Sequence, residues 1–175
     1  IYDKPFGNTL TEHLMRPETA RRAAEVLEEL REGYFIFCRG AVYARHMEKK
    51  HHSEIDFVDR REIVERVRYY HGKEACLQAL DQPIYKFYIY HTNGGHEMAE
   101  IRESLGAVPD HSLTQSNDNN VEIMPAHVSK GTGLKDLAER LSISPENILA
   151  LGDQLNDLPM LNYAGISVAM GNASP

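Results

Sequence analysis

Apolar residues recur at helical spacing in two long segments of the chain. Over residues 16–33, alanine and leucine return every three or four positions, with Pro17 suited to the first helical turn and Gly33 suited to the end. Residues 129–143 repeat this pattern, with leucines and an alanine along one face. Both segments are therefore predicted to form amphipathic helices.

Between these two helices the pattern is mixed. Short runs rich in β-branched and aromatic residues predict strands. These runs cover residues 34–40, 41–45, 83–90, 111–116 and 120–125. Shorter helices are predicted over residues 60–70, 74–80 and 97–105. Such a mixture of short strands and helices is typical of an α+β unit.

The pattern changes after residue 129. The predicted helix is followed by an apolar strand at residues 146–153, a helix at 158–165 and a second apolar strand at 166–171. Strands that are apolar on both faces are typical of a parallel sheet that is covered on both sides. We therefore expect the C-terminal part to be α/β, with its strands fully buried.

Three polar residues follow the first of these apolar strands. Asp153 comes directly after Gly152, and Asn156 and Asp157 lie in the turn before the next helix. Open parallel sheets bind ligands beyond the carboxyl ends of their strands, and carboxylate oxygens are the ligands that Mg²⁺ prefers. The positions predict a magnesium site. The alternative is that these residues only end the strand and cap the helix. An EF-hand loop is excluded, because its acidic spacing is absent.

Lys130 lies at the start of a predicted helix, in the sequence "SKG". A helix N-terminus favours an anion, and an ammonium group beside it makes a phosphate pocket. A solvated lysine at a helix start is the alternative. The following "GTGLKD" is neither a Walker loop nor a dinucleotide fingerprint. We expect Lys130 to face the carboxylates across a phosphate-sized gap.

The composition narrows the classes of function. Apolar residues make up 42% and charged residues 26% of the 175 residues, which is normal for a globular protein. The net charge of −7 argues against binding to a nucleic-acid backbone. No apolar run reaches the roughly 20 residues that a membrane span needs. The two cysteines are too few and too far apart to suggest a disulfide framework. We expect a cytoplasmic protein with no nucleic-acid or membrane partner, and no pattern predicts its oligomeric state.

Several motifs near the C-terminus occur together in a recognisable order. Residues 121–173 contain "SKG", "GDQLND", "ML", "AG" and "VAMGNA". This stretch resembles the C-terminal core of the Cof-type phosphatases in the haloacid dehalogenase superfamily. The resemblance implies a partial Rossmann-like, parallel-sheet core with an inserted α+β cap domain of the C2 type. We expect residues 1–12 and 127–175 to form the partial core, and residues 13–126 to form the cap.

The resemblance also implies a reaction. Members of the Cof-type family are Mg²⁺-dependent phosphomonoester hydrolases that act through an aspartyl-phosphate intermediate. Their substrates are sugar phosphates and other small phosphorylated metabolites. Lys130 would hold the phosphate and steady the nucleophile, and Asn156 would contact the phosphate. Asp153 would ligate Mg²⁺, and Asp157 would contribute to the metal site by orienting its waters.

The nucleophile of that family lies in a "DxDGT" motif, which this sequence does not contain. The "DFVD" at residues 56–59 is not that motif, since no Gly-Thr follows it. We therefore expect the chain to be a fragment that holds half of an active site and is inactive by itself. The alternative function is a non-catalytic module that binds phosphate or a metabolite, or is regulatory. A flavodoxin-like response-regulator domain is a more distant alternative, because it lacks a cap insert.

Overall fold

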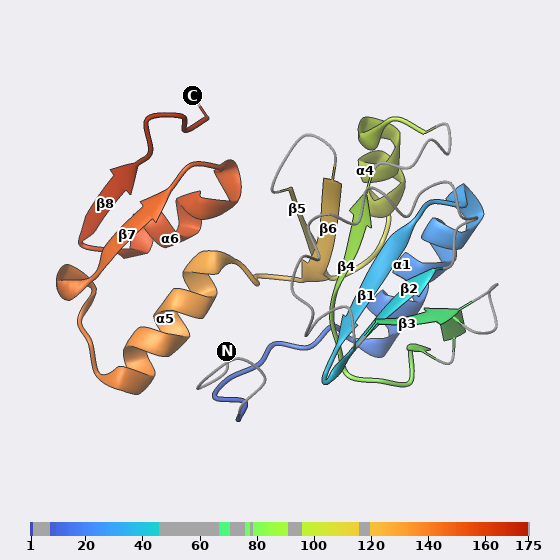
Figure 1. Ribbon diagram of the computed structural model, residues 1–175, viewed down its shortest axis with the longest axis horizontal. Helices are drawn as coiled ribbons and strands as arrows, with labels where there is room; N and C mark the ends of the chain where they lie inside the picture. Colours follow the sequence, from blue (N-terminus) through green and yellow to red (C-terminus); the bar gives the residue numbers. More distant parts are fainter. Residues whose placement is uncertain are drawn as a thin grey trace.

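The computed structural model describes residues 1, 8–45, 67–70, 76–77, 79–90, 96–115 and 120–174. The first part contains α1 (Pro17–Leu30), β1 (Tyr34–Cys38), β2 (Ala41–Arg45), β3 (Val67–Tyr70), β4 (Ile84–Tyr90), α4 (Met98–Gly106), β5 (His111–Thr114) and β6 (Asn120–Pro125). The second contains α5 (Lys130–Leu141), η2 (Pro145–Asn147), β7 (Leu149–Gly152), η3 (Leu155–Asp157), α6 (Leu158–Tyr163) and β8 (Ile166–Ala169). Figure 1 shows the second part beside the first, joined through the segment between β6 and α5.

Six strands of the first part form one mixed sheet, in the order β3-β2-β1-β4-β6-β5. Every neighbouring pair is antiparallel except β2 and β3, which are parallel. Helices α1 and α4 pack on one face of this sheet (Figure 1). The chain therefore has the α+β arrangement that its mixture of short strands and helices predicts.

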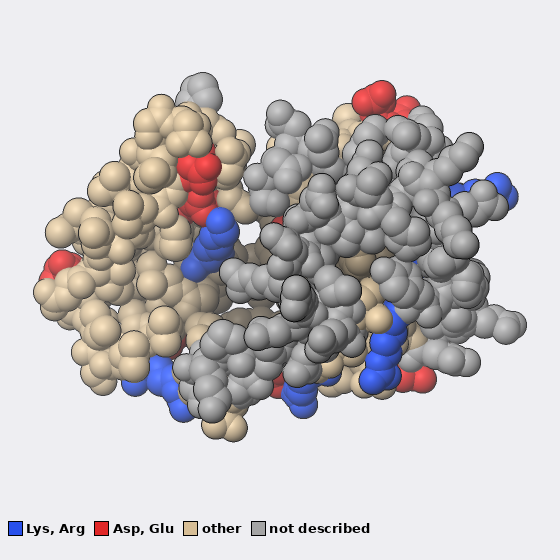
Figure 2. Space-filling view, viewed as in Figure 1, with Lys and Arg blue, Asp and Glu red and all other residues tan. Residues whose placement is uncertain are grey.

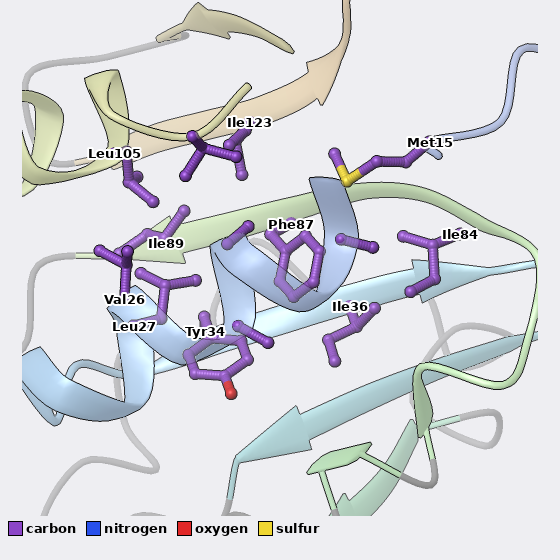
Figure 3. Close-up of a cluster of buried hydrophobic side chains, with 14 of the residues drawn as sticks. Met15, Val26, Leu27, Tyr34, Ile36, Ile84, Phe87, Ile89, Leu105 and Ile123 are labelled. Atoms are coloured by element: carbon purple, nitrogen blue, oxygen red, sulfur yellow. The ribbon is translucent and has the colours of Figure 1, made fainter. Parts of the chain in front are cut away.

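The main hydrophobic core lies between this sheet and its two helices (Figure 3). Leu27 of α1 and Leu105 of α4 belong to this core together with Tyr34 of β1, Phe87 of β4 and Ile123 of β6, which lie on the same face of the sheet. All five residues are fully buried. Because side chains alternate along a strand, the residues between these positions point to the other face of the sheet. That second face turns out to carry the polar groups of the site.

The second part is built on the parallel pair β7 and β8, in which Leu149 pairs with Ile166 and Gly152 with Ala169. The prediction that these strands are buried on both faces was wrong. Ala150 is buried, whereas Leu149, Leu151 and Ile166 are 54–58% exposed. Helices α5 and α6 lie on one side of this two-stranded sheet, and no described residue covers the other side. An apolar run therefore marks a strand that can be buried, but a covering layer must also be present.

Most of the other expected elements are confirmed within one to three residues at each end. One prediction is wrong: residues 67–70, expected to be the end of a helix, form strand β3 and pair with β2 in the register Val42 to Val67. Residues 60–66 lie outside the described residues. The pairing of residues 67–70 with β2 outweighs the helical spacing of these residues. Within the described residues, no helix has the length and apolarity needed to cross a membrane.

The segment before α1 contacts both parts of the molecule. Glu12 accepts hydrogen bonds from the hydroxyl of Tyr85 in β4 at 2.8 Å and, at 3.2 Å, from the guanidinium of Arg39 in the turn between β1 and β2. Thr11 and His13, its neighbours, reach Asp136 of α5 instead, at 3.3 and 2.6 Å. Side chains on alternate sides of one extended segment thus join the sheet to α5. The boundaries 1–12 and 127–175 for the core, and 13–126 for the cap, stay a prediction.

The Asp136 contacts should make stability depend on pH in acid. The hydrogen bond with His13 holds the pKa of Asp136 below its ordinary value of 3.8, and Thr11 adds to this. A carboxylate with a lowered pKa stabilises the fold fully above its ordinary value, and this contribution is lost as the pH falls through the folded-state value. We expect Asp136→Asn to lower the melting temperature at about pH 7 and to make the loss of stability below about pH 4 shallower.

The measurement is the melting temperature from about pH 7 down to about pH 2.5, the range over which carboxylates titrate. Asp110→Asn is the matched control, because Asp110 is a surface carboxylate on a different element, paired with Arg16. An acid limb of unchanged steepness in Asp136→Asn would contradict the prediction.

Candidate functional site

The four residues singled out by the sequence lie around the end of β7 and the start of α5. Strand β7 ends at Gly152, so Asp153 follows at the carboxyl edge of the sheet, and Asn156 and Asp157 lie in η3. Helix α5 begins at Lys130. Its ammonium group forms an ion pair with the Asp157 carboxylate. The expected gap between Lys130 and the carboxylates is therefore closed at Asp157, where the two groups are in direct contact.

Asp157 organises this edge of the sheet. Its side chain is 4% exposed. One carboxylate oxygen, Oδ1, accepts from the Lys130 ammonium. The other, Oδ2, accepts from the backbone N–H groups of Asp153 at 2.9 Å and Gln154 at 3.1 Å. A buried carboxylate is stable only when its oxygens are paired in this way. Asp157 thereby fixes the backbone that carries Asp153 and holds α5 against the end of β7.

Two opposing influences set the ionisation of Asp157. Burial raises the pKa of this carboxyl, because the charged form loses its hydration. The hydrogen bonds from Lys130 and from the two backbone N–H groups lower the pKa, and together they outweigh burial. The pKa of Asp157 therefore lies below its ordinary value, and the group is ionised at neutral pH.

Close backbone contacts explain two of the glycines in the motifs. A Cβ atom on Gly152 would lie 2.5 Å from the Cβ of Asp157, and a Cβ on Gly131 would lie 2.4 Å from the carbonyl oxygen of Pro159. Both distances are far shorter than van der Waals contact allows. Glycine at these positions lets η3 fold back onto the strand end and lets α5 approach α6.

The N-terminus of α5 is oriented toward the same region. The Ser129 hydroxyl caps this helix by accepting from the Thr132 N–H at 3.1 Å. The first N–H groups of a helix and its dipole favour an anion. Lys130 is half-exposed, so its ammonium can contact a ligand while it remains paired with Asp157. This end of the site is suited to a phosphate group.

Asp153 and Asn156 each have a side-chain oxygen without a partner among the described residues. Within the described residues, no side chain pairs with the Asp153 carboxylate, and the buried Asn156 Oδ1 has no hydrogen-bond partner. Carboxylate and amide oxygens suit a hard cation or the donors of a ligand. The described part of the chain holds no group of three or more His, Cys, Asp or Glu side chains that could bind a metal.

A cleft of about 710 Å³ opens from this site toward the six-stranded sheet. Lys130, Asn156 and Leu155 line it on one side, and residues of α4, β4, β5 and β6 line it on the other. In Figure 2, acidic and basic side chains meet beside the hollow that separates the two parts of the molecule. The site therefore lies between the two parts, with the four predicted residues on the C-terminal side.

The sequence predictions did not include the polar groups on the far wall of this cleft. Lys86 of β4 and Glu122 of β6 form an ion pair at 2.6 Å, and Arg102 of α4 donates to the Gln115 amide oxygen at 2.8 Å. The available signal was a single charged residue inside each of the strands "IYKFYIY" and "NVEIMP". A charge on one face of a strand that is otherwise apolar indicates that this face meets polar groups or solvent.

The sequence and the fold of this chain both resemble those of known proteins. The sequence model of one protein family, the haloacid dehalogenase-like hydrolases, matches residues 1–175, which is the whole of the sequence. The chain belongs to the haloacid dehalogenase-like hydrolase family. A curated relative, a 5-amino-6-(5-phospho-D-ribitylamino)uracil phosphatase of Bacillus subtilis, is 38% identical over 74 residues. That match covers 42% of this chain and 30% of the relative.

Solved structures show the same fold. A haloacid dehalogenase-like hydrolase from B. subtilis superposes with a TM-score of 0.73 at 23% identity, covering 97% of this chain and 66% of that one. A sugar phosphatase of HAD subclass IIB superposes with a TM-score of 0.72 at 15% identity, covering 98% of this chain and 60% of that one. The chain thus has the α/β fold of the family, with a partial Rossmann-like core and an α+β cap. It spans about three fifths of the length of these structures.

Substitution of Gly152 should test how closely Asp157 packs on the strand end. We expect Gly152→Ala to destabilise the chain by about 1–3 kcal/mol, because the new methyl group overlaps Asp157 and η3 must shift. Chemical unfolding measured by circular dichroism gives this difference directly.

Gly133→Ala is the matched control for the Gly152 variant. Gly133 lies in α5 and a Cβ there meets no atom within 4 Å. This variant should be neutral or up to about 1 kcal/mol more stable, since alanine favours the helix. Equal effects of the two substitutions would show that the contact between Gly152 and Asp157 is not tight.

Proposed function

We propose that the protein to which this chain belongs is a Mg²⁺-dependent phosphomonoester hydrolase that acts on a small phosphorylated metabolite through an aspartyl-phosphate intermediate. The observation that carries the proposal is the Asp157–Lys130 ion pair, in which Lys130 lines the cleft together with Asn156, while Asp153 follows the end of β7. The family relationship and the names of two relatives, a phosphatase and a sugar phosphatase, support the same reaction. A non-catalytic binding or regulatory module, the alternative considered from the sequence, has no such support.

In this proposal, each of the four residues has a role that follows from its contacts. Lys130 binds the phosphate, because its ammonium lies at a helix N-terminus and faces the cleft. Asn156 donates its amide N–H groups to the same phosphate. Asp157 acts through Lys130, which it orients, and through the backbone of Asp153. Its two oxygens already accept three hydrogen bonds, so its contribution to the metal is to orient bound water.

The donor set fits Mg²⁺ in its chemistry. Asp153 offers a carboxylate that no described side chain occupies, and Asn156 has an unpaired amide oxygen nearby in the chain. Mg²⁺ prefers oxygen ligands and commonly binds one or two carboxylates together with waters and substrate phosphate. We propose Asp153 as the direct ligand from this chain. When bound, the ion would neutralise charge on the phosphoryl group that is transferred.

We propose further that these 175 residues are a part of a longer protein whose remaining segment supplies the aspartate nucleophile. Two facts support this view. The outer face of the β7–β8 sheet exposes Leu149, Leu151, Ile166 and Val168, an apolar surface that a further layer of the fold would cover. The chain also spans only 60% of the HAD subclass IIB structure that it resembles. The aspartate oxygen would bond to the phosphorus as the ester oxygen leaves, and water would then hydrolyse the aspartyl-phosphate.

Activity should therefore depend on the remaining segment. We expect the 175-residue chain to bind Mg²⁺ weakly and to release no phosphate from sugar phosphates or p-nitrophenyl phosphate, because no nucleophile is present. The full-length protein should do both. Asp153→Ala in the full-length protein should reduce kcat by about 100-fold or more, the usual scale for losing an electrostatic group of the site.

Phosphate release with and without Mg²⁺ is the measurement for both chains. Asp81→Ala serves as the control, because Asp81 is an exposed turn residue outside the cleft. Robust turnover by the 175-residue chain would defeat the proposal that it lacks the nucleophile, and an unaffected Asp153→Ala enzyme would defeat the metal assignment.

The exposed sheet face supports a second test. In the 175-residue chain, Leu151→Ala should change the free energy of unfolding by no more than about 0.5 kcal/mol, because Leu151 is 54% exposed. In the full-length protein the same change should cost about 2–5 kcal/mol, as for a buried leucine.

Leu27→Ala is the control, because Leu27 is fully buried in the main core. It should destabilise both chains by about 2–5 kcal/mol. The free energy of unfolding is measured with denaturant for both substitutions in both chains and compared with the unsubstituted proteins. A cost for Leu151→Ala that is equally small in both chains would mean that nothing covers the β7–β8 face.

A further inference from the structure

The cleft extends well beyond the groups that would bind a phosphate. Its volume of about 710 Å³ is that of a site for a whole small molecule. Its far wall is the face of the six-stranded sheet that points away from α1 and α4. Ser112 and Thr114 of β5 and Glu122 of β6 lie on this face. The wall that faces Lys130 is therefore polar, and it can contact the part of a substrate that does not react.

The charges on this wall are unevenly compensated. Lys86 is paired with Glu122, and it also lies 5.1 Å above the ring of Phe37. Lys130, on the opposite side of the cleft, is paired with Asp157. Arg102 differs, since among the described residues its guanidinium meets only the neutral Gln115 amide. The lining thus carries one positive charge that no described carboxylate balances.

The contact with Gln115 leaves Arg102 able to bind a ligand. Arg102 leaves α4 beside the edge strand β5, and Gln115 immediately follows that strand. One of its five N–H donors goes to the Gln115 oxygen at 2.8 Å, which fixes the direction of the guanidinium. Both side chains are half-buried, so the guanidinium is partly removed from water. A partly desolvated cation with free donors is stabilised by an anion.

We propose that Arg102 is a specificity-determining residue that binds a second anionic group of the substrate, at the opposite end of the cleft from Lys130. This rests on the proposed phosphatase function. The planar guanidinium suits a carboxylate or a phosphate, either of which it can bind with two parallel hydrogen bonds. The Ser112 and Thr114 hydroxyls line the cleft beside it, where they can bind hydroxyl groups of the chain that connects the two anions. The substrate class is a small hydroxylated phosphomonoester with a second negative charge.

The test compares substrates that differ only in the second charge, with the full-length protein. The pair 6-phosphogluconate and sorbitol 6-phosphate differs by a carboxylate, and fructose 1,6-bisphosphate and fructose 6-phosphate differ by a phosphate. In one of the two pairs, we expect kcat/KM to be at least about tenfold higher for the member with the second anionic group, which is the scale of one charged hydrogen bond. The pair that shows the preference identifies which anion is bound.

Arg102→Gln should remove this preference by raising KM for the substrate with the second anionic group, with kcat/KM for the member that carries only the reacting phosphate unchanged. Turnover of that singly phosphorylated member also shows that the variant is folded. Arg102→Lys should restore part of the preference, because it keeps the charge and loses the fork. Arg22→Gln is the matched control, since Arg22 is on α1 and pairs with Glu25 outside the cleft.

Two results would overturn the assignment of Arg102. One is a wild-type protein that turns over both members of each pair equally. The other is an Arg102→Gln variant that loses activity equally on the substrates with and without the second anionic group. If the protein hydrolyses none of the four compounds, the proposed function fails. The binding of the same four compounds is then measured by calorimetry. Tighter binding of the members with the second anionic group that is lost in Arg102→Gln supports the inference, and equal binding of both members of each pair contradicts it.

Discussion

The Asp157 carboxylate is the constraint on which the candidate site depends. It is buried at the end of β7, and a buried charge is tolerated only where every oxygen is paired. Lys130 pairs with one oxygen, and the backbone N–H groups that follow β7 pair with the other. The same group thus joins the start of α5 to η3 through two residues, Lys130 and Asp157, that are 27 positions apart in the sequence. It therefore orients the ammonium of Lys130 and helps to fix the backbone of Asp153, whose carbonyl also accepts from the Ser174 N–H at 2.9 Å.

The absence of side chains at two positions makes this arrangement possible. Gly152 leaves room for Asp157 against the strand end, and Gly131 leaves room for Pro159 against α5. Both glycines belong to the motifs that carry the family resemblance, "GDQLND" and "SKG". Their role here is steric, because each allows two backbone segments to approach more closely than a Cβ atom would permit.

The position of the cleft follows from how the two parts are joined. Thr11 and His13 contact α5 while Glu12 contacts the six-stranded sheet, so one short segment has partners on both sides. The sheet face opposite α1 and α4 is consequently held toward the N-terminus of α5. This brings charged side chains of β4, β6 and α4 to the same cleft as Lys130 and Asn156. A ligand in the cleft would contact both parts at once.

Local patterns in the sequence were enough to predict helices α1, α4, α5 and α6 and most strands, and to single out Asp153, Asn156 and Asp157 after β7 and Lys130 at the start of α5. Each of these depends on neighbours a few positions away, such as the spacing of leucines in α5 or the order Gly152, Asp153 in one turn. Only the tertiary structure decided the pairing of Lys86 with Glu122 and of Arg102 with Gln115, because each pair joins different elements. It also decided that residues 67–70 form a strand, since their partner β2 lies far back in the chain. The exposure of Leu149 and Leu151 has the same origin: an apolar strand favours burial, but whether a layer covers it depends on what else packs against the sheet.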